Sequence, residues 1–289
     1  MAPSGPDKIL LIMLGSVRDF VHATAAMALI REENPQAHLT LLTARQFETL
    51  AKASHYFNFV EPGGEVSGPG EWMALIGQLR AGGFRKVCDL HECAASRAIM
   101  MGLSPFGPRR MSPPRPVDPP DMSFVLKTAP TPSPYGAKQR AYAMLFPGAS
   151  EVPEDLRWPA ARYAELGRLL QKRGLDVIIG GTLKDGDFAR NIQHQAPGAR
   201  DLTGGPDLAR LALLAARASV VIGADCGLLH LAAATGAPTV VVQGGAADPA
   251  NSAPRGHVTV LQADRISDLP ADTVDHAVQL LSPEGVRSA

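Results

Sequence analysis

A turn in the second half of the chain holds residues whose types and spacing point to phosphate chemistry. Asp225 and His230 bracket this turn, and Gly227 lets the backbone approach a ligand closely. A strand that enters a helix through such a turn directs the free N–H groups of Cys226, Gly227 and Leu228 toward the carboxyl end of a sheet, where a diphosphate can bind. In this interpretation Asp225 accepts from sugar hydroxyls and His230 donates to a phosphate. The alternative is that Asp225 caps the helix and His230 is packed in its first turn.

Asp19 is the candidate for acid–base chemistry in the first half of the chain. It follows the apolar run Lys8–Met13 and the turn Leu14–Arg18, so it lies at the carboxyl end of a predicted strand. A carboxylate there can take the proton of an attacking hydroxyl group, although an ordinary Asp is a weak base and burial has to raise its pKa. Alternatively, Asp19 only caps a helix that begins at Phe20. That capping box is incomplete, because His22 stands where Glu or Gln is expected.

Strand and helix patterns alternate around both turns. Short apolar runs, of the kind found in parallel strands buried on both faces, are separated by stretches with helical spacing. This alternation predicts an α/β fold with doubly wound parallel sheets. The expected strands are residues 8–13, 38–42, 58–60, 86–90, 143–146, 175–179, 219–223, 239–242 and 257–261. The expected helices are residues 20–34, 46–53, 71–81, 94–101, 161–173, 185–195, 207–216, 228–235 and 271–281.

A proline-rich segment separates the two halves. Ten prolines lie between Pro105 and Pro134, so this segment cannot hold a regular helix for long. Within it we expect only a short strand at residues 123–127. The alternation of strands and helices begins again afterwards. We therefore expect a first domain over residues 1–138 and a second over residues 139–289, each with its own core.

The composition disfavours several classes of protein. The 28 basic and 28 acidic residues cancel to a formal net charge of zero, which does not favour nucleic acid as a partner. The three cysteines, Cys88, Cys93 and Cys226, lack the spacing of a zinc site, and no metal site is expected. No signal peptide and no apolar run of membrane-spanning length is visible, so we expect a soluble, cytoplasmic protein.

Short motifs spread over nearly the whole chain carry a family resemblance. The motifs of the second half are Pro147–Ser150 with Arg157–Pro159, Gly180–Gly181 and Asp225–Ala234. Those of the first half are Leu14–Asp19, similar to an LGxxGD turn, and Asp89–His91, similar to a DLQ loop. In this order and spacing they resemble the ADP-heptose:lipopolysaccharide heptosyltransferases, glycosyltransferase family 9. The resemblance implies a GT-B arrangement, in which two Rossmann-like doubly wound parallel-sheet domains face a central cleft.

The resemblance also implies roles for individual residues. Asp19 corresponds to the catalytic base that takes the proton of the acceptor hydroxyl. The residues implied on the donor side, which bind the nucleotide and its diphosphate, are Gly148, Ser150, Arg157, Gly181, Asp225, Cys226, Gly227, Leu228 and His230. Those implied on the acceptor side are Gly15, Arg18 and His91.

The activity that follows is an inverting, metal-independent glycosyl transfer without a cofactor. No DxD-type metal motif stands at a predicted strand end, and the backbone N–H groups, the Ser150 hydroxyl and Arg157 can spread over the departing diphosphate instead. The resemblance implies a nucleotide sugar as donor, with heptose from ADP-heptose as the expected sugar. The acceptor is expected to be lipopolysaccharide core or a related surface glycan or glycolipid, with peripheral contact to the inner membrane.

Three residues depart from the family pattern. Arg18 replaces a Gly in the first turn, Leu156 replaces a Lys in the donor loop, and Cys226 replaces a Ser or Thr. Arg157 can supply the phosphate contact missing at Leu156, and Cys226 keeps its backbone N–H. These departures leave open a degenerate protein that binds a nucleotide sugar or a partner without transfer. A nicotinamide-dependent oxidoreductase is disfavoured, because neither strand end has a GxGxxG motif.

Overall fold

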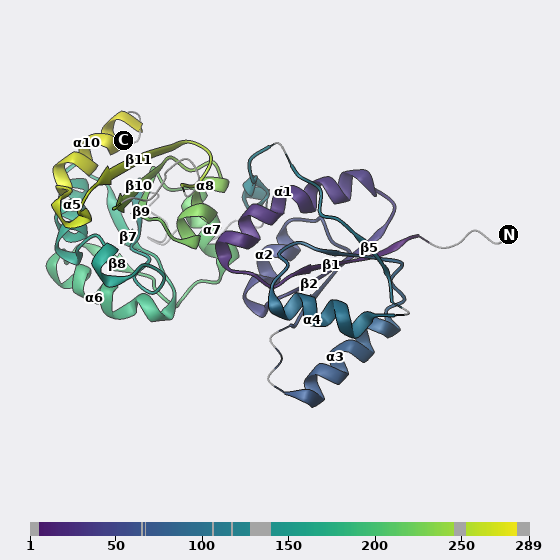
Figure 1. Cartoon of the computed structure of the whole chain (residues 1–289). Helices are drawn as coiled ribbons and strands as arrows, with labels where there is room; N and C mark the ends of the chain where they lie inside the picture. The colour runs from purple at the N-terminus through teal and green to yellow at the C-terminus, as the bar shows by residue number, and fades with distance from the viewer. Residues whose placement is uncertain are drawn as a thin grey trace. The chain divides into compact units, whose positions relative to one another are not determined.

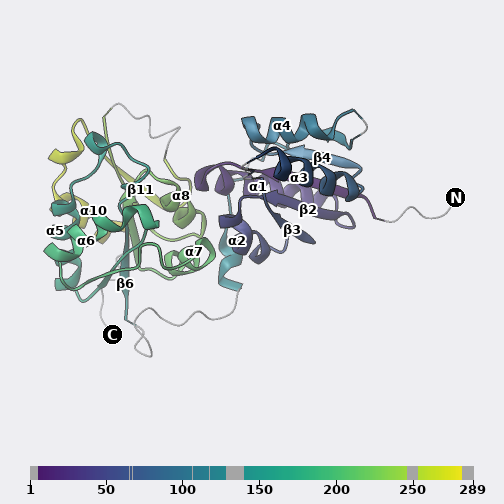
Figure 2. The same ribbon diagram turned by 90° about the horizontal axis from the view of Figure 1, so that it is seen from below.

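The chain folds into two compact units, residues 1–120 and 121–289, each built on one parallel sheet (Figures 1 and 2). The computed structural model describes residues 6–64, 66, 68–105, 107–116, 118–127, 140–245 and 253–281. The predicted domain boundary at residues 138 and 139 lies outside these residues. Residues 121–127 already belong to the second unit, because the 3₁₀ turn η2 (Ser123–Lys127) packs on helix α7 (Leu208–Ala216) and the Met122 N–H donates to the Ala234 carbonyl.

The first unit has a five-stranded sheet in the order β3-β2-β1-β4-β5. Helix α1 covers one face of this sheet, and α3 and α4 cover the other (Figure 1). The strands are β1 (Lys8–Met13), β2 (His38–Thr43), β3 (Phe59–Pro62), β4 (Lys86–Asp89) and β5 (Arg109–Met111). The helices are α1 (Val17–Glu33), α2 (Glu48–Ala53, after the 3₁₀ turn Arg45–Phe47), α3 (Pro69–Ala81) and α4 (Ala94–Leu103).

Strand β1 organises the first unit because both of its faces are buried. Leu10 and Ile12 pack with residues of α3 and α4 in one core cluster. On α1, Phe20 stacks on Phe47 with 4.5 Å between ring centroids. Ile12 pairs in parallel register with Asp89, so the loop after β4 begins level with the turn after β1. This register brings two of the predicted motifs to one edge of the sheet.

The second unit has a six-stranded sheet in the order β11-β10-β9-β6-β7-β8. The strands are β6 (Tyr142–Phe146), β7 (Asp176–Ile179), β8 (Ala199–Asp201), β9 (Val220–Ala224), β10 (Thr239–Gly244) and β11 (Val258–Ala263). The helices are α5 (Ala160–Lys172), α6 (Gly186–Gln195), α7, α8 (Gly227–Ala234) and α10 (Ala271–Leu281), with 3₁₀ turns at Glu154–Leu156, Leu183–Asp185 and Ile266–Asp268.

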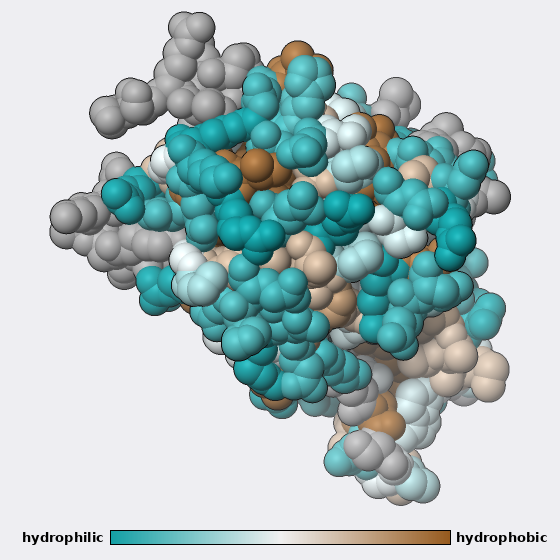
Figure 3. Space-filling model, turned by 90° about the vertical axis from the view of Figure 1, so that its left-hand side faces the viewer, coloured by the Kyte–Doolittle hydropathy of each residue, from teal (hydrophilic) through white to brown (hydrophobic). Residues whose placement is uncertain are grey.

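The helices of the second unit form a layer on each side of its sheet. Helices α5, α6 and α10 pack together on one face, and α7 and α8 lie on the other (Figure 1). The space-filling view in Figure 3 is mostly hydrophilic, with apolar residues only in small scattered groups. A layer of this kind buries one stripe of each helix and leaves its polar side to solvent.

The core of the second unit includes Trp158, which is fully buried. Its ring packs edge-on against Tyr163 with 4.7 Å between centroids, and its N–H donates to the Leu269 carbonyl at 3.0 Å. A Trp at the junction of a loop and a helix belongs to the core more often than to a sugar site, and these contacts place Trp158 in the core.

The predicted elements differ from the structure in a few places. Strands β5 and β8, three residues each, were not predicted, and residues 123–127 form a 3₁₀ turn rather than a strand. Helix α1 begins at Val17 rather than at Phe20. No helix within the described ranges is both long enough and apolar enough to span a bilayer.

Candidate functional site

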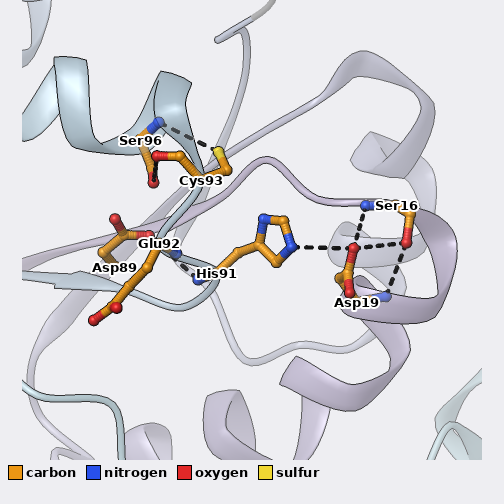
Figure 4. Close-up of polar contacts among 7 residues, drawn as sticks. All are labelled: Ser16, Asp19, Asp89, His91, Glu92, Cys93 and Ser96. Atoms are coloured by element: carbon orange, nitrogen blue, oxygen red, sulfur yellow. Dashed lines mark hydrogen bonds and ion pairs between the residues drawn. The ribbon is translucent and has the colours of Figure 1, made fainter.

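The turn after β1 fixes the Asp19 carboxylate in place. Ser16 is the N-cap of α1 and Asp19 is its third residue, so the two form a complete capping box (Figure 4). Asp19 Oδ2 accepts from the Ser16 backbone N–H at 2.8 Å and from the Ser16 hydroxyl at 2.6 Å, while the Asp19 N–H donates to Ser16 Oγ at 3.3 Å. The expectation of an incomplete box was wrong, because the helix begins earlier and Asp19 itself takes the place of the expected Glu.

His91 reaches Asp19 from the neighbouring strand. Its Nε2 lies 3.1 Å from Asp19 Oδ2 (Figure 4). The loop that carries His91 is held by Asp89, whose Oδ1 accepts from the backbone N–H groups of His91 at 3.2 Å and Glu92 at 3.0 Å. Glu92 has a positive φ of 52°, which turns the chain sharply toward α4. The structure thus brings together two predicted site residues that lie far apart in the sequence.

The contacts of Asp19 keep it ionised. Partial burial acts to raise its pKa, but the hydrogen bonds from Ser16 and the nearby imidazoles of His91 and His22 outweigh it, and the pKa lies below the ordinary value. Burial thus acts in the expected direction, but in this structure the net pKa is lowered rather than raised. All three of these contacts to the carboxylate end on Oδ2. Within the described residues, Oδ1 is left to accept a proton from a ligand.

Gly15 is required by the position of Asp19. A Cβ atom at residue 15 would lie 2.7 Å from Asp19 Cβ and 2.8 Å from its Oδ2, so any side chain there would push the carboxylate away. This steric conflict explains why a glycine stands at position 15, one of the predicted acceptor-side residues. Arg18 lies next to Asp19 in the first turn of α1, and its role toward an acceptor stays a prediction.

The second unit contains a matching capping box with a different outcome. Thr182 and Asp185 follow Gly181, and Asp185 Oδ2 accepts from the Thr182 N–H at 2.7 Å and from its hydroxyl at 2.8 Å. Here the other oxygen, Oδ1, is occupied by the Ser150 N–H at 2.7 Å, and Asp185 is buried. The Asp19 side chain is 35% exposed and has no such partner on Oδ1 among the described residues. In the same local structure, the second carboxylate oxygen is therefore occupied in Asp185, whereas in Asp19 it has no partner among the described residues.

Ser16→Ala is expected to destabilise the first unit in a pH-dependent way. The variant loses the cap, worth about 1 kcal/mol, and the Asp19 pKa rises toward its ordinary value. A carboxylate with a lowered pKa stabilises the fold above its unfolded-state pKa and loses this contribution as the pH falls through its folded-state value. The deficit of the variant should therefore be largest near neutral pH and shrink in acid. Urea unfolding at about pH 7 and about pH 3 measures it.

The control for this experiment is Ser112→Ala, which changes an exposed serine of the same unit. It should unfold like the wild type at both pH values. A Ser16→Ala deficit that is equal at both pH values would show that Asp19 does not depend on this hydroxyl.

Cys93 is a neighbour of this site that sequence reasoning did not single out. It is the N-cap of α4, and its sulfur accepts from the Ser96 N–H at 3.4 Å (Figure 4). Burial acts to raise the pKa of the thiol, but the N–H groups of Ser96 and Ala95 and the His91 side chain together hold it below the ordinary value. The signal available in the sequence was a cysteine two residues after His91, at the start of a predicted helix.

The donor-side turn after β9 pairs Asp225 with His230. His230 Nε2 lies 3.0 Å from Asp225 Oδ1, and the imidazole is buried. The N-cap of α8 is Cys226 and makes no side-chain capping bond. The N-cap of the helix is thus Cys226 rather than Asp225, and the Asp225 carboxylate holds the imidazole. His230 is both packed and paired.

The start of α8 is occupied by a carboxylate of the chain itself. The Gly227 N–H donates to Glu151 Oε2 at 2.8 Å, a contact that sequence reasoning missed. Burial and the nearby Glu151 raise the pKa of the Cys226 thiol far above its ordinary value, so it stays protonated. Gly148 has a φ of 62°, and a Cβ there would lie 2.6 Å from Cys226 Cβ, which explains why a glycine stands in this loop.

The remaining donor-side residues lie at the ends of β6 and β7. The Ser150 hydroxyl is 3.3 Å from that of Thr182, and Arg157 Nε donates to the Val152 carbonyl at 2.6 Å. Phe146 pairs with Gly223, so the loop after β6 begins level with the turn after β9. The predicted donor residues of the second unit thus share the carboxyl edge of one sheet. In the described part of the chain, no three His, Cys, Asp or Glu side chains are grouped as metal ligands.

Comparison with known proteins assigns the family. The model of glycosyltransferase family 9 (heptosyltransferase) matches residues 109–262, more than half of the chain. The chain belongs to glycosyltransferase family 9. Lipopolysaccharide heptosyltransferase 2 of Salmonella typhimurium is a curated relative of this family 9 chain, 34% identical over 103 residues. That match covers 34% of this chain and only 29% of the relative.

Solved structures share the fold of this family 9 protein over nearly its whole length. E. coli ADP-heptose lps heptosyltransferase II has a TM-score of 0.78 at 21% identity, covering 96% of this chain and 99% of that chain. E. coli heptosyltransferase WaaC with ADP has a TM-score of 0.76 at 19% identity, covering 95% and 99%. At these identities the likeness establishes a fold of two α/β domains of the GT-B type.

Proposed function

We propose that this protein is an inverting glycosyltransferase that moves a sugar, heptose from ADP-heptose, onto a lipopolysaccharide-core or related surface-glycan acceptor. The observation that carries the proposal is the Asp19 carboxylate, which is ionised and fixed through Oδ2, while Oδ1 has no partner among the described residues. The family match and the curated heptosyltransferase relatives support the donor and the reaction. A glycolipid acceptor would bring this protein to the inner membrane from the cytoplasmic side.

In the proposed mechanism Asp19 is the general base. Its Oδ1 takes the proton of the acceptor hydroxyl, whose oxygen then attacks the anomeric carbon of the donor sugar. The diphosphate leaves from the opposite side, so the configuration at that carbon is inverted. His91 donates to Oδ2 and keeps the Asp19 carboxylate oriented while that carboxylate takes up the proton. Gly15, Arg18 and His91 form the proposed acceptor side.

The departing diphosphate is stabilised by the second unit. We place it at the start of α8, where the N–H groups of Cys226, Gly227 and Leu228 and the His230 imidazole can spread over its charge. The Ser150 hydroxyl and the outer nitrogens of Arg157 add donors from the loop after β6. We place the nucleoside half over β6 and β7, beside Gly148 and Gly181. No metal ion is needed in this scheme, because protein donors neutralise the leaving group.

Calorimetric titration with ADP, UDP, GDP, CMP and NAD, with and without a chelator, tests this proposal. We expect selective binding of ADP that survives chelation. Preference for another nucleotide would keep a glycosyltransferase and discard heptose as the sugar. Loss of ADP binding in chelator would contradict the metal-independent scheme.

A non-catalytic protein that binds a nucleotide sugar or a partner is the second candidate. Glu151 favours it, because this carboxylate already holds the Gly227 N–H that the diphosphate needs. Binding of no nucleotide by a folded protein would support this candidate over the first.

A further inference from the structure

Gln243 is a buried amide without a hydrogen-bond partner among the described residues. The residue is 5% exposed, and neither its Nε2 nor its Oε1 is bonded to any of them. Burying an unpaired amide destabilises the folded state, so an unpaired group of this kind in a folded protein requires an explanation. Its neighbour across the strand pair, Gln262, does not supply one, because the Gln262 Nε2 donates to the Gly245 carbonyl at 2.8 Å.

The strand places Gln243 at the proposed donor site. Side chains alternate along β10, and Val240 and Val242 belong to the core shared with α5 and α10. Gln243 therefore lies on the other face, where α8 contacts the sheet. Val242 pairs with Ala224, so Gln243, one residue further on, stands level with Asp225. The unpaired amide and the Asp225–His230 pair thus share one face and one edge of the sheet.

The sheet order decides which part of a nucleotide sugar lies nearest to Gln243. The strands run in the order β10-β9-β6-β7, and the proposed function puts the nucleoside over β6 and β7 and the diphosphate over the turn after β9. The far end of the diphosphate, which carries the sugar, then falls over β10. Sugar hydroxyls both donate and accept, so a neighbouring pair of them satisfies the amide oxygen and the amide nitrogen together.

We propose that Gln243 is a specificity-determining residue that binds hydroxyl groups of the transferred sugar. This inference rests on the proposed function, because it takes the diphosphate to lie at the start of α8. It explains why the chain keeps a polar side chain at a buried position where an apolar one would cost nothing. The sugar hydroxyls supply the hydrogen bonds that the Gln243 amide does not make with the described residues.

The test compares the binding of ADP with that of ADP-heptose by calorimetry in the wild type and in Gln243→Leu. The wild type should bind ADP-heptose more tightly than ADP. The variant should bind ADP as the wild type does but lose about tenfold in affinity for ADP-heptose, the value of a hydrogen-bonded amide. Its melting temperature should not fall, because the substitution removes an unpaired buried group.

A matched control variant separates an effect at Gln243 from a general effect on the sheet. Gln262→Leu changes the paired glutamine on the adjacent strand and should leave the preference for ADP-heptose unchanged. Equal losses for both ligands in Gln243→Leu, or no loss for either, would overturn the inference. If Gln243→Leu melts early, Gln243→Met, which keeps the length of the side chain, takes its place. Wild-type protein that binds no ADP would instead refute the proposed donor site itself.

Discussion

Asp19→Asn should reduce sugar transfer by about 10²–10⁴-fold and leave ADP binding unchanged. Asn keeps the shape of the side chain and can still accept from Ser16, but it cannot take a proton from the acceptor hydroxyl at neutral pH. ADP binding should persist, because the proposed nucleotide residues belong to the other unit. Initial rates with ADP-heptose, measured beside ADP titrations of the same sample, give both quantities.

Asp118→Asn is the matched control, since it changes an exposed aspartate of the same unit. It should transfer sugar at the wild-type rate. Near-wild-type transfer by Asp19→Asn would rule out Asp19 as the base. The pH profile adds a second check: because the Asp19 pKa is lowered, the rate should stay level down to acidic pH and fall only below the ordinary Asp value, near pH 4.

Glu151→Gln should tighten ADP binding by about tenfold. Glu151 accepts from the Gly227 N–H, so its negative charge stands where the diphosphate is proposed to bind and repels it. Gln is uncharged and releases the N–H more readily. The effect should diminish at high salt, because screening weakens the repulsion in the wild type as well. Calorimetric titration with ADP at low and high salt measures the difference.

Glu154→Gln is the control, because Glu154 is an exposed acidic residue of the same loop. It should bind ADP as the wild type does. Weaker binding by Glu151→Gln would mean that this carboxylate contacts the ligand directly, for example through a ribose hydroxyl, rather than competing with it.

The sequence predicts the long elements well because each carries its own signal. Strand β1 is a continuous apolar run, and α10 has an apolar stripe, and both occur at the predicted residues. Strands β5 and β8 were not predicted, because each has only three residues, of which two are charged. These segments are strands because they pair with β4 and β7, not because of their composition. Tertiary pairing of this kind cannot be predicted from the sequence of the segment itself.

The site shows the same division between local and long-range information. Asp19 and the Asp225–His230 pair lie in turns that the sequence marks clearly. The contact between His91 and Asp19 depends on strand register, and the contact between Glu151 and Gly227 depends on how two loops meet. One local signal was overlooked: Gly15-Ser16 with Asp19 and Gly181-Thr182 with Asp185 repeat the pattern Gly-[Ser/Thr]-x-x-Asp. That pattern predicts both capping boxes.

The buried Trp158 connects two distant parts of the second unit. It directly follows Arg157 of the donor loop, and its N–H is satisfied by the Leu269 carbonyl just before α10. The loop that is proposed to hold the diphosphate is therefore anchored to the segment just before α10. A truncation from the carboxyl end that removes Leu269 would displace this loop without removing a single proposed donor residue. The geometry of the site therefore depends in part on residues that do not contact the ligand.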